Sequence, residues 1–255
     1  MKISQAKAVI TGGASGLGLA VAKHVVAAGG QVTLLDINDE AGAAAVAELG
    51  ANANYLNVNV TDEAAVVAAI EAAKGHMGGV NVNVNCAGVI GAGRVLGREA
   101  PMALDYFANV ININLVGSFN VAKASAAAME ANEPGEDGER GVIINTASVA
   151  AYEGQIGQAA YSASKGGIVG MTLPMAREFT RIGVRVMAIA PGIFWTPMVD
   201  GMPPEVQESL SASIPFPSRL GKPEEFAELA AHIVENGYLN GTTLRLDGAV
   251  RMQPK

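Results

Sequence analysis

The stretch Thr11-Gly12-Gly13-Ala14-Ser15-Gly16-Leu17-Gly18 decides the fold, and it directly follows the short apolar run Ala8-Val9-Ile10. A glycine-rich turn between a strand and a helix allows close backbone approach, and the helix N-terminus offers unpaired N–H groups to an anion. Glycine turns also arise for purely steric reasons, so the motif alone leaves a structural role open. The stretch predicts a strand, a phosphate-binding turn and a helix as the first unit of an α/β domain.

The rest of the chain repeats this order, because short runs rich in Val and Ile alternate with alanine-rich segments. Such a rhythm is typical of a parallel sheet with helices on both faces. We expect seven strands, near residues 7–11, 31–35, 54–58, 80–85, 141–146, 184–190 and 242–246, and helices that start near residues 16, 62, 102, 158 and 223. The predicted fold class is α/β: a Rossmann-type, doubly wound, seven-stranded parallel sheet in one domain spanning residues 1–255.

Two segments interrupt the rhythm. Residues 130–141 combine Gly and Pro with acidic side chains, and we expect a solvated loop there. Residues 194–221 contain several prolines, with Met198 and Met202 among apolar neighbours, which is too irregular for one continuous helix. We interpret this second segment as a lid over the substrate. The alternative, that its Met and Phe side chains fill the core or a subunit contact, stays open.

Composition narrows the set of partners. The formal net charge is −7, from 17 Lys and Arg against 24 Asp and Glu, so the chain lacks the basic excess that nucleic acid or anionic lipid would attract. Apolar runs such as residues 184–190 are far shorter than the ~20 residues that span a bilayer. We therefore expect a small-molecule substrate, no nucleic acid and no membrane.

The single cysteine and the three histidines give no evidence for a disulfide or a metal site. The single cysteine, Cys86, agrees with a reducing compartment, and residues 8–11 already form the first predicted strand, so we expect a cytoplasmic protein without a leader. A lone cysteine at an apolar strand end is more often a packing residue than a reactive thiol, although both remain open. His24, His76 and His232 lack ligand spacing, and we predict no metal site.

Asp36 supports the dinucleotide interpretation of the glycine turn. It closes the second predicted strand about 20 positions after the turn, where a carboxylate can accept hydrogen bonds from ribose hydroxyls. A carboxylate there repels the 2′-phosphate of NADP, and its neighbours Leu35 and Ile37 supply no cation. These residues predict NAD as the cofactor, with a plain turn role for Asp36 as the alternative.

A second motif predicts catalysis. Tyr161 and Lys165 are four residues apart, so both side chains project from one face of a helix. A neighbouring ammonium stabilises a phenolate and makes tyrosine usable as a base, although such pairs are common on solvated helices. Ser148 ends a buried-type strand, and ligands of open α/β sheets bind beyond the carboxyl ends of the strands. The three residues should therefore meet the glycine turn at one edge.

These residues resemble the short-chain dehydrogenase/reductase family. Its motifs are T-G-x-x-x-G-x-G, N-N-A-G, an active-site Asn, a Ser, Y-x-x-x-K and P-G-x-x-x-T. Their counterparts, which cover nearly the whole chain, are residues 11–18, Asn85-Cys86-Ala87-Gly88, Asn114, Ser148, residues 161–165 and residues 191–196. Motifs and resemblance together predict these cofactor-binding residues: Gly12, Ser15, Gly16, Leu17, Gly18, Asp36, Asn59, Val60, Cys86, Ala87, Gly88, Tyr161, Lys165, Pro191, Gly192, Phe194 and Thr196.

The resemblance also implies a mechanism. Tyr161 acts as the phenolate base, Ser148 orients the substrate oxygen, and Lys165 lowers the pKa of Tyr161 and holds the nicotinamide ribose. Asn114 positions a water that relays the proton, and we predict that Gln158 contacts substrate together with Ser148 and Tyr161. The catalytic set is thus Ser148, Tyr161, Lys165 and Asn114.

Two positions depart from the family's pattern. Asn59 replaces a common Asp whose carboxylate accepts from the adenine amino group, and we expect its amide oxygen to accept instead, with somewhat weaker NAD binding. Asn81 also replaces a common Asp, and the sequence offers no functional reason for it.

A narrower resemblance concerns the substrate. Residues 143–151, 153–155, 157–161, 164–168, 215–221 and 245–249 resemble NAD-linked members that act on short or branched 3-hydroxyacyl-CoA thioesters and assemble as homotetramers. A hydroxysteroid or other secondary-alcohol dehydrogenase and a 3-oxoacyl-ACP reductase remain open. A dinucleotide-binding scaffold without chemistry is the non-enzymatic alternative, against which the intact catalytic residues argue.

Overall fold

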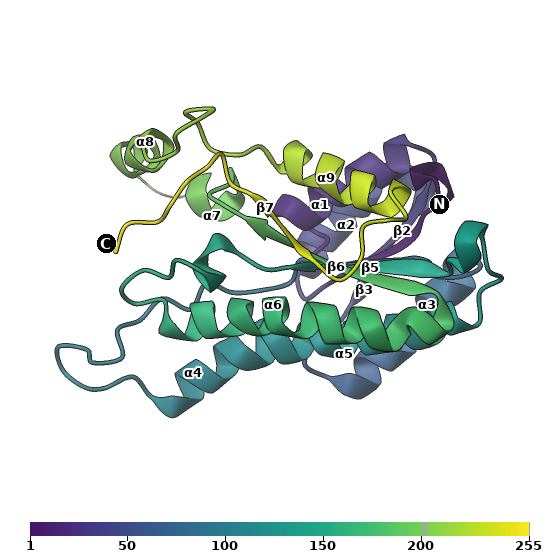
Figure 1. Cartoon of the computed structure of the whole chain (residues 1–255), viewed down its shortest axis with the longest axis horizontal. Helices are drawn as coiled ribbons and strands as arrows, with labels where there is room; N and C mark the ends of the chain where they lie inside the picture. The colour runs from purple at the N-terminus through teal and green to yellow at the C-terminus, as the bar shows by residue number, and fades with distance from the viewer. Residues whose placement is uncertain (201–202, 255) are drawn as a thin grey trace.

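The computed structural model describes residues 1–200 and 203–254, and its centre is one sheet of seven parallel strands (Figure 1). The strand order is β3-β2-β1-β4-β5-β6-β7, with the chain reversing direction across the sheet between β1 and β4. The strands are β1 (Lys7–Thr11), β2 (Gln31–Asp36), β3 (Ala53–Asn57), β4 (Val82–Asn85), β5 (Gly141–Thr146), β6 (Val184–Pro191) and β7 (Thr243–Leu246). The predicted fold class is confirmed, and each predicted strand lies within two residues of its predicted bounds.

Helices cover both faces of the sheet. They are α1 (Gly16–Ala27), α2 (Asp39–Leu49), α3 (Glu63–Met77), α4 (Leu104–Ile111), α5 (Gly117–Glu130), α6 (Ala159–Phe179), α7 (Pro197–Asp200), α8 (Pro204–Ala212) and α9 (Pro223–Glu235). Buried side chains of α1, α2 and α9 pack with one face of the central strands, and those of α3, α5 and α6 pack with the other. Successive strand residues point to opposite faces, so Val9 joins one core and Ile10 the other.

The helix α2 was not among the predicted helices. Asn38 caps it by accepting from the Ala41 N–H, and Asp39 and Glu40 complement the helix dipole in its first turn. Only Gly42 and Ala45 of this helix are buried, so its sequence carries almost no apolar stripe from which a helix could be predicted.

The helix predicted from residue 102 is a longer, interrupted one. The helices α4 and α5 are joined without a break by a π-helical segment, Asn112–Val116. A π segment shifts the side chains by a fraction of a turn, and here it turns Asn114 inward to a fully buried position. The interruption therefore serves the site described below.

The two irregular segments differ from each other. Of residues 130–141, Glu130 ends α5 and the buried Gly141 begins β5, so the loop is shorter than predicted. Most residues between them are exposed as expected, but Glu139 is drawn inward by an ion pair of 2.7 Å with the buried Arg185. The region of residues 194–221 contains the short helices α7 and α8, in agreement with the absence of one continuous helix. Gly201, Met202 and the side chain of Met198 lie outside the described part. Phe194 belongs to the core, where it meets Phe226 edge to face.

None of the helices in the described residues combines the length and the apolar character that crossing a bilayer requires.

Candidate active site

The glycine turn lies between β1 and α1, at the carboxyl edge of the sheet. Gly12 has a φ of 60°, and a Cβ there would lie 2.8 Å from the Ala87 N, while a Cβ at Gly18 would collide with the Gly12 carbonyl oxygen. Both positions therefore require glycine. Thr11 fastens the turn to the segment after β4, since its Oγ1 accepts from the N–H groups of Cys86 and Ala87 at 3.1 Å.

A cavity of about 1060 Å³ runs along this edge. Every residue predicted to bind cofactor or substrate lines it: Gly12, Ser15, Gly16, Leu17, Gly18, Asp36, Asn59, Val60, Cys86, Ala87, Gly88, Ser148, Gln158, Tyr161, Lys165, Pro191, Gly192, Phe194 and Thr196. The parallel strands explain this convergence, because the register aligns Thr11 with Leu35 and with Asn85, and Thr146 with Ile189. The N-terminus of α1 opens onto the same cavity, so the turn fits a dinucleotide phosphate.

Asp36 combines two roles. One carboxylate oxygen accepts from the backbone N–H groups of Ile37 and Asn38, which is the turn role considered from sequence. The other accepts from the Ala14 N–H in the glycine turn at 3.2 Å and lies at the cavity wall. An oxygen with one neutral donor retains capacity for a further hydrogen bond, so the turn role does not prevent recognition of a ribose.

The environment of Asn59 changes its expected role. Its amide oxygen accepts from the N–H of Thr61 at 3.1 Å and from the Thr61 hydroxyl at 2.9 Å. Both lone pairs are therefore engaged, and this oxygen is not available to accept from an adenine amino group. Asn81 lies at the opposite edge of the sheet, where it accepts from the Lys7 N–H and donates to the Gln5 carbonyl. Its role is to connect β4 with the start of β1.

Cys86 is a packing residue in the cofactor wall. Burial raises the pKa of its thiol to about 11, and the Thr146 hydroxyl donates to its sulfur at 3.5 Å. A thiol with so high a pKa carries little thiolate at neutral pH and is a poor nucleophile.

Ser148, Tyr161 and Lys165 meet beyond the end of β5. The Lys165 ammonium is buried, donates to the Thr146 carbonyl at 2.7 Å and lies 5.8 Å from the centre of the Tyr161 ring. The Ser148 hydroxyl lies close enough to the Tyr161 phenol to lower the pKa of that phenol. The Ser148 oxygen also accepts from the Ala150 N–H at 3.1 Å, which fixes its position.

Burial has the largest effect on the pKa values of Tyr161 and Lys165. Burial raises the pKa of Tyr161, and the hydrogen bond from Ser148 opposes that rise. Burial also lowers the pKa of Lys165 to about 8, because a buried ammonium loses its hydration. Ser148 therefore favours the phenolate, and the role of Lys165 in lowering the pKa of Tyr161 stays a prediction.

Asn114 supports the site from the π segment. Its side-chain oxygen accepts from the Val89 N–H at 2.8 Å, and its amide donates to the Val89 carbonyl and to the Ser164 oxygen. These bonds hold the segment after β4 against α6. Both amide hydrogens of the side chain are engaged, but its oxygen has a single donor and retains one lone pair with which it could position a water.

Sequence reasoning missed two contributors. Thr146 anchors Lys165 through its carbonyl, and Met252 lines the cavity from the C-terminal segment. A contact to a backbone carbonyl leaves no motif in the sequence from which it could be predicted. Met252 could not be predicted because it lies far from the other site residues along the chain. The described residues contain no group of three or more His, Cys, Asp or Glu side chains that could hold a metal ion.

The chain belongs to the short-chain dehydrogenase family, whose model matches residues 6–207. It is an oxidoreductase, and members of this family use a nicotinamide cofactor to interconvert secondary alcohols and ketones. The scaffold without chemistry is therefore set aside.

Relatives with more specific names resemble the chain over nearly its full length. The 3-hydroxyacyl-CoA dehydrogenase type-2 of Homo sapiens is 53% identical over 249 residues, which cover 97% of this chain and 95% of that relative. The enzyme of the same name from Drosophila melanogaster is 50% identical, with 99% and 100% covered. The crystal structure of 3-hydroxyacyl-CoA dehydrogenase type-2 from Mycobacterium avium matches with a TM-score of 0.93 at 42% identity, over 100% of this chain and 98% of that one.

Proposed function

We propose that the chain is an NAD-dependent 3-hydroxyacyl-CoA dehydrogenase of fatty-acid metabolism, which oxidises the 3-hydroxyl group of a short or branched acyl thioester to a ketone. The main observation behind this proposal is that a single cavity is lined by Asp36 and the glycine turn and also by Ser148, Tyr161 and Lys165. The substrate class is supported by relatives at 50–53% identity that bear this name. A cytoplasmic location stays a prediction, supported by the single cysteine.

The preference for NAD over NADP is supported by charge. Asp36 is the acidic side chain of the cavity, and Lys165 is the sole cation among the described residues that line it. Ile37, beside Asp36, is 70% exposed and offers no positive charge to a 2′-phosphate. A ribose with two free hydroxyls suits this end of the cavity, and a phosphorylated one meets repulsion.

The residues divide the work of the reaction. The Tyr161 phenolate accepts the hydroxyl proton of the substrate, and Ser148 donates to the same substrate oxygen and holds it toward the phenol. A nicotinamide held by the residues of this cavity would supply the acceptor for the hydride of the carbinol carbon. Lys165 provides positive charge next to Tyr161 when protonated, and Thr146 orients it. In the reverse direction Tyr161 donates its proton to the ketone oxygen.

A second candidate is a dehydrogenase of steroids or other neutral secondary alcohols. The observation in its favour is that the cavity that contains Ser148 also has apolar lining residues such as Val149, Ile193 and Leu210. Such a wall suits an apolar ring system as well as an acyl chain.

NADH formation at 340 nm distinguishes these candidates when a short 3-hydroxyacyl-CoA, a hydroxysteroid and a simple secondary alcohol are each tested with NAD and with NADP. We expect fastest turnover for the thioester with NAD. Tyr161→Phe should keep NAD affinity and lose at least about a hundredfold in kcat, since it removes the proton acceptor. An inert thioester beside a reactive steroid would overturn the substrate class, and full activity of Tyr161→Phe would remove Tyr161 from its role.

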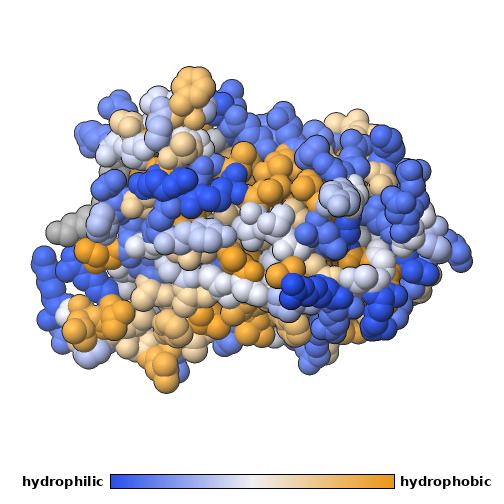
Figure 2. All heavy atoms as spheres, viewed as in Figure 1, coloured by the Kyte–Doolittle hydropathy of each residue, from blue (hydrophilic) through white to orange (hydrophobic). Residues whose placement is uncertain are grey.

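The homotetramer is also a proposal. Large apolar side chains on the outer helical layer are exposed, among them Leu104 (78%), Val116 (46%), Phe119 (47%) and Leu173 (43%). Figure 2 shows apolar side chains gathered along the lower edge of the molecule, where α4, α5 and α6 lie in Figure 1. An exposed apolar surface of this kind is typical of subunit contacts.

A further inference from the structure

The C-terminal segment lies along the stretch between Ser148 and Tyr161. The Met252 N–H donates to Glu153 at 3.3 Å, the Gln155 side chain donates to the Gln253 carbonyl at 3.0 Å, and the Ile156 N–H donates to the Pro254 carbonyl at 3.0 Å. Three consecutive residues of the tail are thus bound to the segment that connects two catalytic residues.

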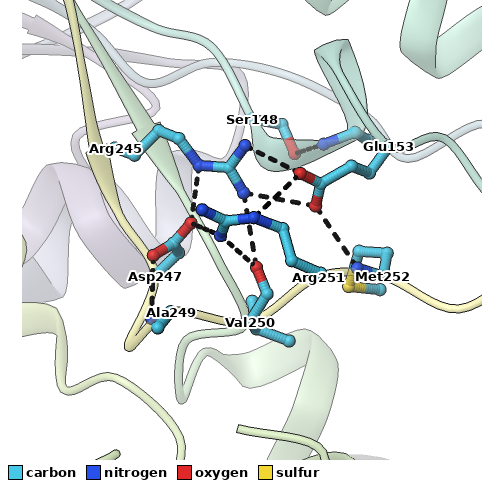
Figure 3. Close-up of polar contacts among 9 residues, drawn as sticks. Ser148, Glu153, Arg245, Asp247, Ala249, Val250, Arg251 and Met252 are labelled. Atoms are coloured by element: carbon cyan, nitrogen blue, oxygen red, sulfur yellow. Dashed lines mark hydrogen bonds and ion pairs between the residues drawn. The ribbon is translucent and has the colours of Figure 1, made fainter. Parts of the chain in front are cut away.

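An ion cluster fixes this arrangement (Figure 3). Glu153 accepts from both terminal nitrogens of Arg245, at 2.9 and 3.2 Å, and pairs with Arg251 Nε at 3.4 Å. Asp247 pairs with Arg245 Nε at 2.7 Å and with Arg251 Nη1 at 3.2 Å. Two carboxylates therefore balance two guanidinium groups. The Arg245 pair is two-pronged and three-quarters buried, so it holds its geometry better than an exposed ion pair.

Met252, which the ion cluster holds in place, lies between the active-site cavity and an apolar cluster. Met252 lines the same cavity as Ser148 and Tyr161. It also packs against the apolar cluster of Val199, Ile214, Leu220 and Val250, which joins the lid region to the tail. A methionine side chain is flexible and polarisable, so it forms a wall that adapts to apolar groups of different size.

We propose that Met252 is a specificity-determining residue, which contacts the apolar substituent of the carbinol carbon, and that Glu153 is the positioning residue that holds it in the cavity wall. Ser148 and Tyr161 fix the reacting oxygen, so the substituents of the neighbouring carbon must extend along the walls, one of which carries Met252. The selectivity part rests on the proposed function, whereas the positioning part rests only on the contacts of Glu153.

Chain-length selectivity tests the role of Met252. With 3-hydroxyacyl-CoA substrates of four, six and eight acyl carbons, Met252→Ala should raise the kcat/KM of the eight-carbon substrate relative to the four-carbon one by about tenfold, the scale of one or two methylenes in an apolar pocket. Equal change at every chain length would overturn the role of Met252.

Matched variants test Glu153. Glu153→Gln keeps the shape and removes the charge, and it should shift the same ratio in the same direction by a smaller factor. Added to Met252→Ala it should produce no further shift, because both changes act through one side chain. Glu130→Gln, which breaks an exposed pair with Arg181 elsewhere on the surface, is the control and should leave the ratio unchanged. A ratio that Glu153→Gln does not move would contradict the link to Met252.

Hydrogen exchange needs no substrate, so it tests the positioning role of Glu153 separately from the selectivity role of Met252. In Glu153→Gln the amides of residues 249–253 should exchange at least about tenfold faster than in Glu130→Gln or in the unsubstituted protein. Unchanged protection would overturn the positioning role of Glu153. If the unsubstituted enzyme turned over none of the thioesters, the proposed function and the selectivity role of Met252 would fail together, and the exchange result would still decide the role of Glu153.

Discussion

Lys165, to which we assign a role in catalysis, lowers the stability of the fold. Burial lowers its pKa from 10.5 to about 8, so between these values the unfolded chain binds a proton that the folded protein does not. The free energy of unfolding therefore rises with pH in this window, and below pH 8 the fold carries a buried charge. The hydrogen bond to Thr146 offsets part of that cost. A buried ammonium is the kind of unfavourable group that a site retains for its chemistry.

Ser148 should control the pH dependence of oxidation. The hydrogen bond from Ser148 lowers the pKa of Tyr161 against the effect of burial, so removing it raises that pKa. In Ser148→Ala the midpoint of the rise of kcat/KM with pH should therefore move to higher pH. Rate profiles for alcohol oxidation between pH 6 and 10 measure this midpoint. Ser162→Ala removes a neighbouring hydroxyl without a partner and should leave it in place.

Asn59 should limit cofactor affinity. Its amide oxygen is taken by Thr61, whereas a carboxylate in its place would bring a second oxygen that can accept from the adenine amino group. We expect Asn59→Asp to tighten NAD binding by about 1 kcal/mol, roughly fivefold, in a fluorescence titration. Asn81→Asp makes the same chemical change at the far edge of the sheet and serves as the control. Equal affinity of Asn59→Asp and the unsubstituted protein would refute the expectation.

At the scale of elements, the π segment between α4 and α5 is a support for the site. Within it, the buried Asn114 side chain bonds both backbone groups of Val89. Asn114→Ala should therefore lower the free energy of unfolding by about 2 kcal/mol, because it leaves the Val89 groups unpaired. Urea unfolding measures the loss. Ser164→Ala removes a single hydrogen bond of Asn114 and should cost less, and an equal cost for both would contradict the role of Val89.

At the scale of the whole molecule, the exposed face of α4 and α5 should govern assembly. Phe119 is 47% exposed, and a carboxylate there would be unfavourable within an apolar subunit contact. Phe119→Asp should sediment as a species smaller than a tetramer. Val67, with a similar exposure of 48% on α3, provides the control, since Val67→Asp should not change the sedimentation. A tetramer that persists in Phe119→Asp would place the interface elsewhere.

How far the sequence could predict the molecule depends on the range of the interactions. The strands could be predicted because each is a short buried run, and the glycine turn and the Tyr161–Lys165 pair because their residues are neighbours in the chain. The helix α2 could not, since it buries only Gly42 and Ala45. The ion cluster of Glu153 could not either, because its partner Arg245 is 92 residues away and no periodicity connects them. Burial, which sets the pKa of Lys165, is likewise a property of the assembled fold.

The order of the strands makes the two ends of the cavity different in charge. Among the described lining residues, its two charged side chains are Asp36, which ends β2, and Lys165, which is bonded to the carbonyl of Thr146 at the end of β5. The strands β2 and β5 are three strand spacings, or about 14 Å, apart in the sheet. The cavity is thus an asymmetric channel, with its anion at one end and its cation at the other. A dinucleotide that entered backwards would bring its nicotinamide to the carboxylate and its adenine to the catalytic tyrosine. The topology of the sheet therefore encodes the orientation of the ligand as well as its place.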